Sequence, residues 1–186
     1  MKSALVLGTA LLAIAGVAGC GENLTAPTAS QAPFVGQFAG TWSGALVLTP
    51  SGVSGGECVG ADLIAGATLG SSFDQNTVNV TQKDSDVSAI VRSATTGLSC
   101  QYDGTAALTS FALSSVSCDA EILFQCSNGN PRVLKPVGST ITATQNGDRA
   151  SGVVTTTYNV FSVDSQNNEK PVAGLTVQQQ FTAIRR

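Results

Sequence analysis

The stretch VAGLTVQQQFTAI, residues 172–184, decides the fold class because its side chains alternate between apolar and polar. One face carries Leu175, Val177, Phe181 and Ala183. The opposite face carries Thr176, Gln178, Gln180 and Thr182. A period of two is typical of a β-strand that lays one face on a core and the other on solvent. We therefore expect a strand here.

The same alternation runs through FAGTWSGALVLT, residues 38–49, where Phe38, Trp42, Leu46 and Leu48 are the apolar positions. Further strands are expected at 57–68, 76–82, 87–93, 99–107, 111–118, 121–126, 138–145 and 150–163. No window shows a helical period, so the chain predicts about eight to ten short strands. Asn146-Gly147 favours a tight hairpin between neighbouring antiparallel strands. The expected fold is all-β, an antiparallel up-and-down barrel, with a β-sandwich as the alternative.

Composition excludes several classes of function. Only 11% of the 186 residues are charged, the formal net charge is −3, and histidine is absent. An acidic chain offers no basic surface for phosphates, so no nucleic-acid partner is expected. Without histidine there is no Ser-His-Asp or Cys-His machinery, and the sequence has no P-loop, G-x-G-x-x-G or G-x-S-x-G motif. We expect no enzyme, no cofactor and no metal site.

Residues 1–19 predict a signal peptide. Lys2 supplies the positive start, and the apolar run from Ala4 to Ala15 is shorter than the ~20 residues that span a bilayer. The segment ends in Val17-Ala18-Gly19-Cys20, which resembles the lipobox of bacterial lipoproteins. The resemblance implies that Cys20 is acylated and becomes the first residue after cleavage. An ordinary secretory signal with an incidental cysteine is the alternative.

The lipoprotein resemblance also implies a place in the cell. Gly21, not Asp, follows Cys20, which implies the outer membrane of a bacterial cell envelope; a Gram-positive source would imply the outer face of the plasma membrane. The membrane is then a partner through the N-terminal lipid, and three acyl chains hold firmly. Residues 20–34, rich in Ala, Thr, Ser and Pro, are expected to form a flexible tether, and 35–186 a single barrel domain.

The four remaining cysteines are expected to form two disulfide bonds, because an exported domain matures in an oxidising compartment. They are Cys58, Cys100, Cys118 and Cys126. Reflecting position 100 through the expected turn at Thr109-Ser110 brings it to 118 or 119, so Cys100 should face Cys118 across a hairpin. This leaves Cys58 for Cys126. A zinc site is the alternative, but no C-x₂₋₄-C pair is present.

Gly40 and Trp42 open the first strand, and Arg185 follows the last one. This combination resembles the calycin barrels, such as lipocalins and avidins. The resemblance implies that Gly40, Trp42 and Arg185 close one end of a barrel, with the indole as a plug and the guanidinium stacked on its face. The lipocalin T-D-Y motif and the Arg-x-Tyr clamp of fatty-acid-binding proteins are absent.

Gln179 is the polar residue that alternation turns toward the expected interior, on the face of Val177 and Phe181. Its amide needs a partner there, because an unpaired buried amide costs ~1–3 kcal/mol. A ligand, a neighbouring strand or a buried water supplies one. Two functions stay open: an envelope lipoprotein that binds a small apolar ligand inside its barrel, or a structural lipoprotein with a solid core that contacts another envelope protein.

Overall fold

The computed structural model describes residues 36–68, 72–94, 97–119 and 121–186, which belong to one compact unit. The expected signal peptide, the lipobox with Cys20 and the expected tether therefore lie outside the described residues. The elements in chain order are β1 (Gly40–Gly55), α1 (Glu57–Thr68), β2 (Ser72–Lys83), β3 (Asp86–Ser93), β4 (Ser99–Ala106), β5 (Ser110–Asp119), β6 (Ile122–Gln125), β7 (Pro131–Asn146), β8 (Arg149–Val163) and β9 (Glu169–Arg185).

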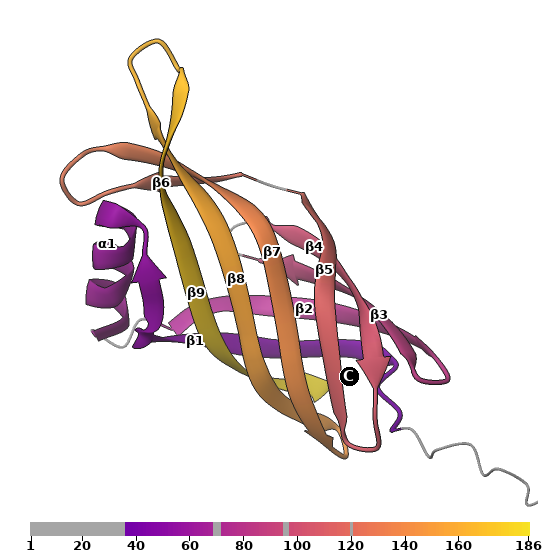
Figure 1. The fold of residues 1–186 in the computed structure, drawn as a ribbon. Helices are drawn as coiled ribbons and strands as arrows, with labels where there is room; N and C mark the ends of the chain where they lie inside the picture. The colour runs from indigo at the N-terminus through magenta and orange to yellow at the C-terminus, as the bar shows by residue number, and fades with distance from the viewer. Residues whose placement is uncertain (1–35, 69–71, 95–96, 120) are drawn as a thin grey trace, which may run out of the picture. The chain divides into compact units, whose positions relative to one another are not determined.

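The strands form one antiparallel sheet that closes into a ring (Figure 1). From β1 to β5 each strand pairs with the next along the chain, and so does each from β7 to β9; pairing of β9 with β1 and of β5 with β7 completes the ring. The expected all-β class and antiparallel barrel are confirmed. The hairpin of β8 and β9 extends beyond the ends of the other strands.

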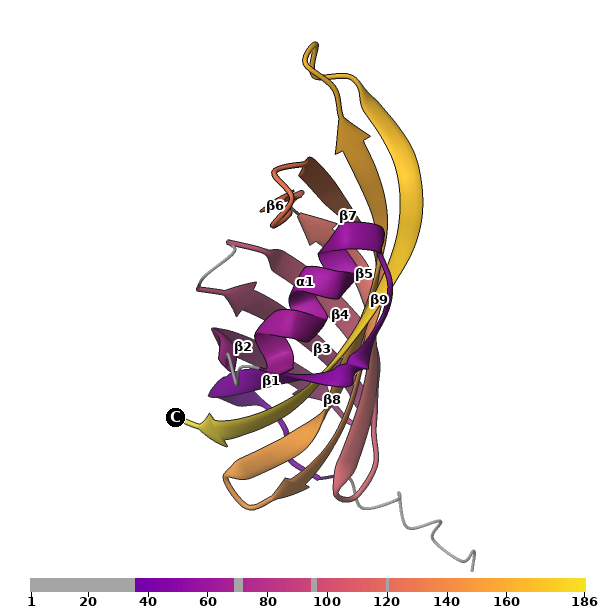
Figure 2. The ribbon, with the colours of Figure 1, turned by 90° about the vertical axis from the view of Figure 1, so that its left-hand side faces the viewer.

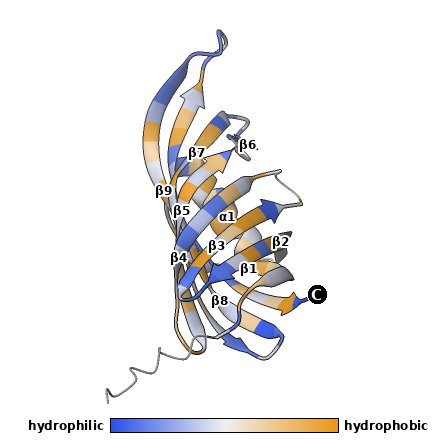
Figure 3. Ribbon diagram, turned by 90° about the vertical axis from the view of Figure 1, so that its right-hand side faces the viewer, coloured by the Kyte–Doolittle hydropathy of each residue, from blue (hydrophilic) through white to orange (hydrophobic). Residues whose placement is uncertain are grey.

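Hydrophobic and hydrophilic residues alternate along the strands, as Figure 3 shows. Glycine lets neighbouring strands approach closely at two points of the ring. A Cβ at Gly44 in β1 would collide with the carbonyl oxygen of Thr182 in β9, and one at Gly152 in β8 would collide with that of Thr142 in β7. Close backbone approach at such points lets a sheet coil until its edges meet.

The long strand β7 pairs with two different strands on the same side, one after the other along its length. Ser110–Ser114 of β5 pair with the C-terminal half of β7, whereas β6 pairs with its first residues. The prediction for β7, 138–145, is too short, because the strand begins at Pro131 and runs through Pro136. The register shifts between Pro136 and Gly138, a bulge that accommodates a residue without an amide hydrogen.

The expected strand at 57–68 is wrong, because these residues form α1. Gly55 and Gly56 have positive φ angles, which end β1 and turn the chain. Val59, Leu63 and Ala67 then recur every four residues and pack into the core along one side of the helix. No helix within the described ranges has the length and apolar character needed to cross a membrane.

The core has two parts, one toward each end of the ring. We call the end where β1 begins and β9 finishes the floor, and the end that carries α1 the helix end (Figure 2). Buried residues of the first part include Phe38, Trp42, Val87, Ala89, Tyr102, Leu113 and Ile141. Those of the second include Leu48, Val59, Cys126, Leu134, Val160, Leu175 and Val177. Side chains of α1 thus meet inward-facing side chains of β1, β7, β8 and β9.

Candidate functional site

A cavity of about 300 Å³ lies inside the ring, between Trp42 at the floor and Leu63 of α1. Its lining includes the inward side chains Leu46, Val78, Val91, Phe111, Leu113, Ile141, Val154, Val177 and Phe181. Among the described residues that line it, none carries a charge. Concave, mostly apolar cavities with a few polar groups are the usual form of small-molecule sites, and this volume is at the lower end of their range.

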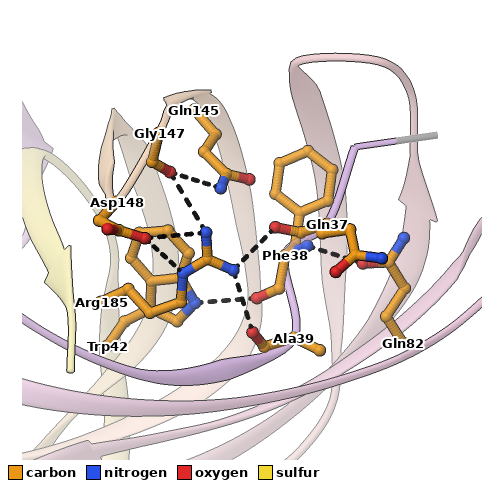
Figure 4. Close-up of polar contacts among 9 residues, drawn as sticks. All are labelled: Gln37, Phe38, Ala39, Trp42, Gln82, Gln145, Gly147, Asp148 and Arg185. Atoms are coloured by element: carbon orange, nitrogen blue, oxygen red, sulfur yellow. Dashed lines mark hydrogen bonds and ion pairs between the residues drawn. The ribbon is translucent and has the colours of Figure 1, made fainter.

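The floor is a short segment folded under Trp42 (Figure 4). The indole Nε1 donates a hydrogen bond of 2.9 Å to the carbonyl oxygen of Phe38. The Gln82 side chain holds the same segment twice: its Oε1 accepts from Phe38 N at 2.7 Å, and its Nε2 donates to Gly36 O at 2.8 Å. The Phe38 ring, 1% exposed, packs edge-on against Phe111. These contacts close the floor.

Arg185 secures this segment from the other side of the indole. Its Cζ lies 5.1 Å from the centre of the Trp42 ring, a cation–π contact. Its Nη1 donates to the carbonyl oxygens of Gln37 at 3.1 Å and Ala39 at 3.4 Å, and its Nη2 lies 3.0 Å from Asp148 Oδ1. Trp42 and Arg185, the residues that the calycin resemblance nominated for barrel closure, therefore lie in contact.

Gly40 is the third nominated residue, and its place explains its identity. Its φ of +132° is a conformation that other residues rarely adopt. A Cβ there would lie 3.1 Å from Arg185 Cδ. The glycine thus lets the arginine side chain lie close over the backbone.

Both disulfide bonds are the predicted pairs, one in each part of the core. Cys100 and Cys118 face each other in register across β4 and β5. Cys58 of α1 joins Cys126, which follows β6. The first bond fixes neighbouring strands, and the second ties the helix to the turn between β6 and β7.

Two further contacts hold α1 to the same turn. Asp62 accepts hydrogen bonds from the backbone N and the hydroxyl of Ser127, each 2.7 Å long. These bonds, the backbone one first, lower the pKa of the Asp62 carboxyl below its ordinary value. Glu57 pairs with Arg132 at 3.3 Å. The helix is therefore fastened mainly through its first half, with Leu63 beside the cavity.

A chain of hydroxyl groups that the sequence did not predict reaches the cavity, because three of its members, Tyr102, Thr156 and Tyr158, line it. Tyr102 Oη donates to Ser139 Oγ at 3.0 Å, Ser139 bonds Thr156 Oγ1 at 2.8 Å, and Thr156 also bonds Tyr158. Burial raises the pKa of Tyr102 and raises that of Tyr158 to about 12, so both phenols stay neutral. Alternation places Tyr158 on the inward face of β8, but the network joins three strands and depends on their register.

Gln179 also lines the cavity, with Val177 and Phe181, on the face that alternation predicts. Its neighbours on β9 point outward, and Gln178 bonds Thr155 there at 3.4 Å. In the described part of the chain, no group forms a hydrogen bond with the Gln179 side chain. It is the lining amide that is open to a ligand.

Comparisons with family models, curated proteins and solved structures found no match to this chain. The described residues contain no group of three or more His, Cys, Asp or Glu side chains placed to hold a metal ion. The cavity itself must therefore carry the functional argument.

Proposed function

We propose that this protein is a lipid-anchored lipoprotein of the bacterial cell envelope whose barrel binds one small apolar molecule. The observation that carries the proposal is the cavity of about 300 Å³, floored by Trp42 and bordered by Leu63 of α1. A structural barrel with a solid core has no need of such a space, because protein interiors pack at nearly crystalline density.

The lining favours hydrocarbon. Its side chains come mainly from Val, Leu, Ile and Phe, and each methylene group moved into it from water contributes ~0.8 kcal/mol. The floor contacts and the Cys58–Cys126 bond keep the lining in place without a ligand. A pre-formed site loses less entropy on binding than a flexible one.

The membrane anchor is part of the proposal and rests on the sequence. The lipobox-like Val17-Ala18-Gly19-Cys20 supports acylation of Cys20, and the tether after it supports a domain that stands clear of the bilayer. Gly21 supports the outer membrane as the location. The apolar molecule would then be held beside a membrane, where such molecules are abundant.

Native mass spectrometry of the protein extracted from the membranes of a producing bacterium tests this function. We expect a single additional mass that organic solvent removes. Val154→Phe and Val91→Phe each fill part of the cavity and should reduce the occupied fraction, while Val47→Phe, at an exposed position, should not. Repeatedly empty spectra would contradict the proposal and favour the alternative, a structural or protein-interaction lipoprotein.

A further inference from the structure

Gln179 is a polar residue whose neighbours in the barrel wall are aliphatic. Strand register places it beside Leu48 on one side and Val154 on the other, and the row continues through Ile141 and Leu113. All five residues line the cavity. Gln179 is the polar member of an otherwise aliphatic row.

The Gln179 amide has no hydrogen-bond partner among the described residues, whereas the other inward-facing polar side chains of the lining have an interaction. Tyr102, Thr156 and Tyr158 are bonded within the hydroxyl chain, and Asn76 also has an interaction. An amide offers two donor hydrogens and one acceptor oxygen. The Gln179 side chain is half-buried and lines the cavity, so a ligand group inside the cavity can pair with its amide.

The cavity also lacks a counter-charge. None of the described lining residues is charged, and both lining tyrosines stay neutral because burial raises their pKa. The guanidinium of Arg185 at the floor lies against the indole of Trp42 and is paired with Asp148, whose side chain is 75% exposed. A carboxylate moved into this space would lose its hydration without gaining a cation.

From these observations we infer that the cavity selects an uncharged ligand, a mainly hydrocarbon molecule with one hydroxyl or carbonyl group, and that Gln179 binds this group. The inference rests on the proposed function and narrows it. At about 30 Å³ for each water in the liquid, the cavity of about 300 Å³ holds a ligand on the order of ten non-hydrogen atoms. Fatty-acid anions of the same length are excluded.

A matched pair of brominated probes tests the selection by charge. 11-Bromo-1-undecanol and 11-bromoundecanoate differ in the head group, and bromine quenches tryptophan fluorescence on contact. Trp42, the single tryptophan of the chain, borders the cavity and reports occupancy. The titrations use the full chain with Cys20→Ser, oxidised, so that no acyl group competes.

At pH 8 we expect saturable quenching by the alcohol with one site, and binding of the carboxylate at least about tenfold weaker. As the pH falls through the pKa of the probe's carboxyl group, its affinity should rise toward that of the alcohol, whose affinity should not change. Equal or tighter binding of the carboxylate at pH 8 would overturn the inference and leave the proposed function standing. Absence of quenching by either probe would contradict the proposed function itself.

Gln179→Leu tests the role of the amide. We expect this substitution to weaken binding of 11-bromo-1-undecanol about fivefold to tenfold, the effect of one hydrogen bond. Binding of 1-bromoundecane, which lacks a head group, should not be weakened. Gln180→Leu, at the neighbouring outward position, is the matched control and should leave the affinity for both probes unchanged. Equal losses for both probes in Gln179→Leu would mean that the residue only shapes the cavity, and would overturn its assignment as the binding group.

Discussion

Replacement of Arg185 tests how the floor of the barrel is held. Arg185→Ala removes the contact of the guanidinium with the Trp42 ring, its bonds to the carbonyl oxygens of Gln37 and Ala39, and its ion pair with Asp148. The substitution leaves the strand pairing of β9 in place, because that pairing uses backbone groups. The segment under Trp42 then keeps the indole and Gln82 bonds.

The size of the effect follows from the exposure of each contact. The Arg185 side chain is 25% exposed, so the cation–π contact contributes about 0.5–1 kcal/mol. The pair with the exposed Asp148 contributes at most about 1 kcal/mol. Hydrogen bonds from a charged donor to two carbonyl groups add about 1–2 kcal/mol at this exposure, with the longer one weak. We expect Arg185→Ala to lower the free energy of unfolding by about 2–3 kcal/mol, and Arg185→Lys by roughly half of that.

Urea unfolding of the oxidised protein, followed by Trp42 fluorescence and far-UV circular dichroism, measures this change. Arg186→Ala is the matched control. Among the described residues its guanidinium bonds the hydroxyl of Ser43 alone, in an exposed contact, so the change should matter by less than about 0.5 kcal/mol. Asp148→Asn should cost less than about 1 kcal/mol. If Arg185→Ala were no more destabilising than Arg186→Ala, the floor would not depend on this residue.

Three other changes give independent checks. Replacing Cys58 and Cys126 together by alanine should lower the free energy of unfolding by about 4 kcal/mol in the chain-entropy account, because the bond spans 68 residues. Denaturant titration of the double variant measures this loss. A loss below about 1 kcal/mol would mean that α1 is not held by this bond. Gly40→Ala should cost about 1–3 kcal/mol, since φ is +132° and Arg185 lies close, and an unchanged melting temperature would refute the argument. The pKa of Tyr158 is raised to about 12, so the folded state keeps a proton that the unfolded state loses above pH 10. The free energy of unfolding should therefore fall between pH 10 and 12, and it should fall less steeply in Tyr158→Phe. Urea unfolding at several pH values measures both.

Much of this architecture follows from features that each strand carries alone. Alternation in 172–184 places Gln179 inside the barrel, and counting through one hairpin pairs Cys100 with Cys118. Those are local relations, settled by the period of a strand and the symmetry of a turn. They survive in the structure because one face of each strand has to be buried.

The features that escaped prediction depend on more than one element. In α1, only three residues, Val59, Leu63 and Ala67, follow the four-residue repeat of a helix, which is a weak signal in the sequence. The end of the preceding strand is marked by the two glycines at 55 and 56. The hydroxyl chain is assembled from β4, β7 and β8, so its existence follows from register and not from any single stretch. The cavity likewise depends on how the closed ring spaces its inward side chains.

The most direct measurement is an NMR search for contacts between 1-undecanol and isotopically labelled methyl groups of the protein. The account predicts nuclear Overhauser effects from the ligand chain to the inward methyl groups of Leu113, Ile141 and Val154, and none to the exposed Val47 or Ile184. Contacts confined to exposed methyl groups, or no contacts at saturating alcohol, would contradict the claim that the interior of the ring is a ligand site.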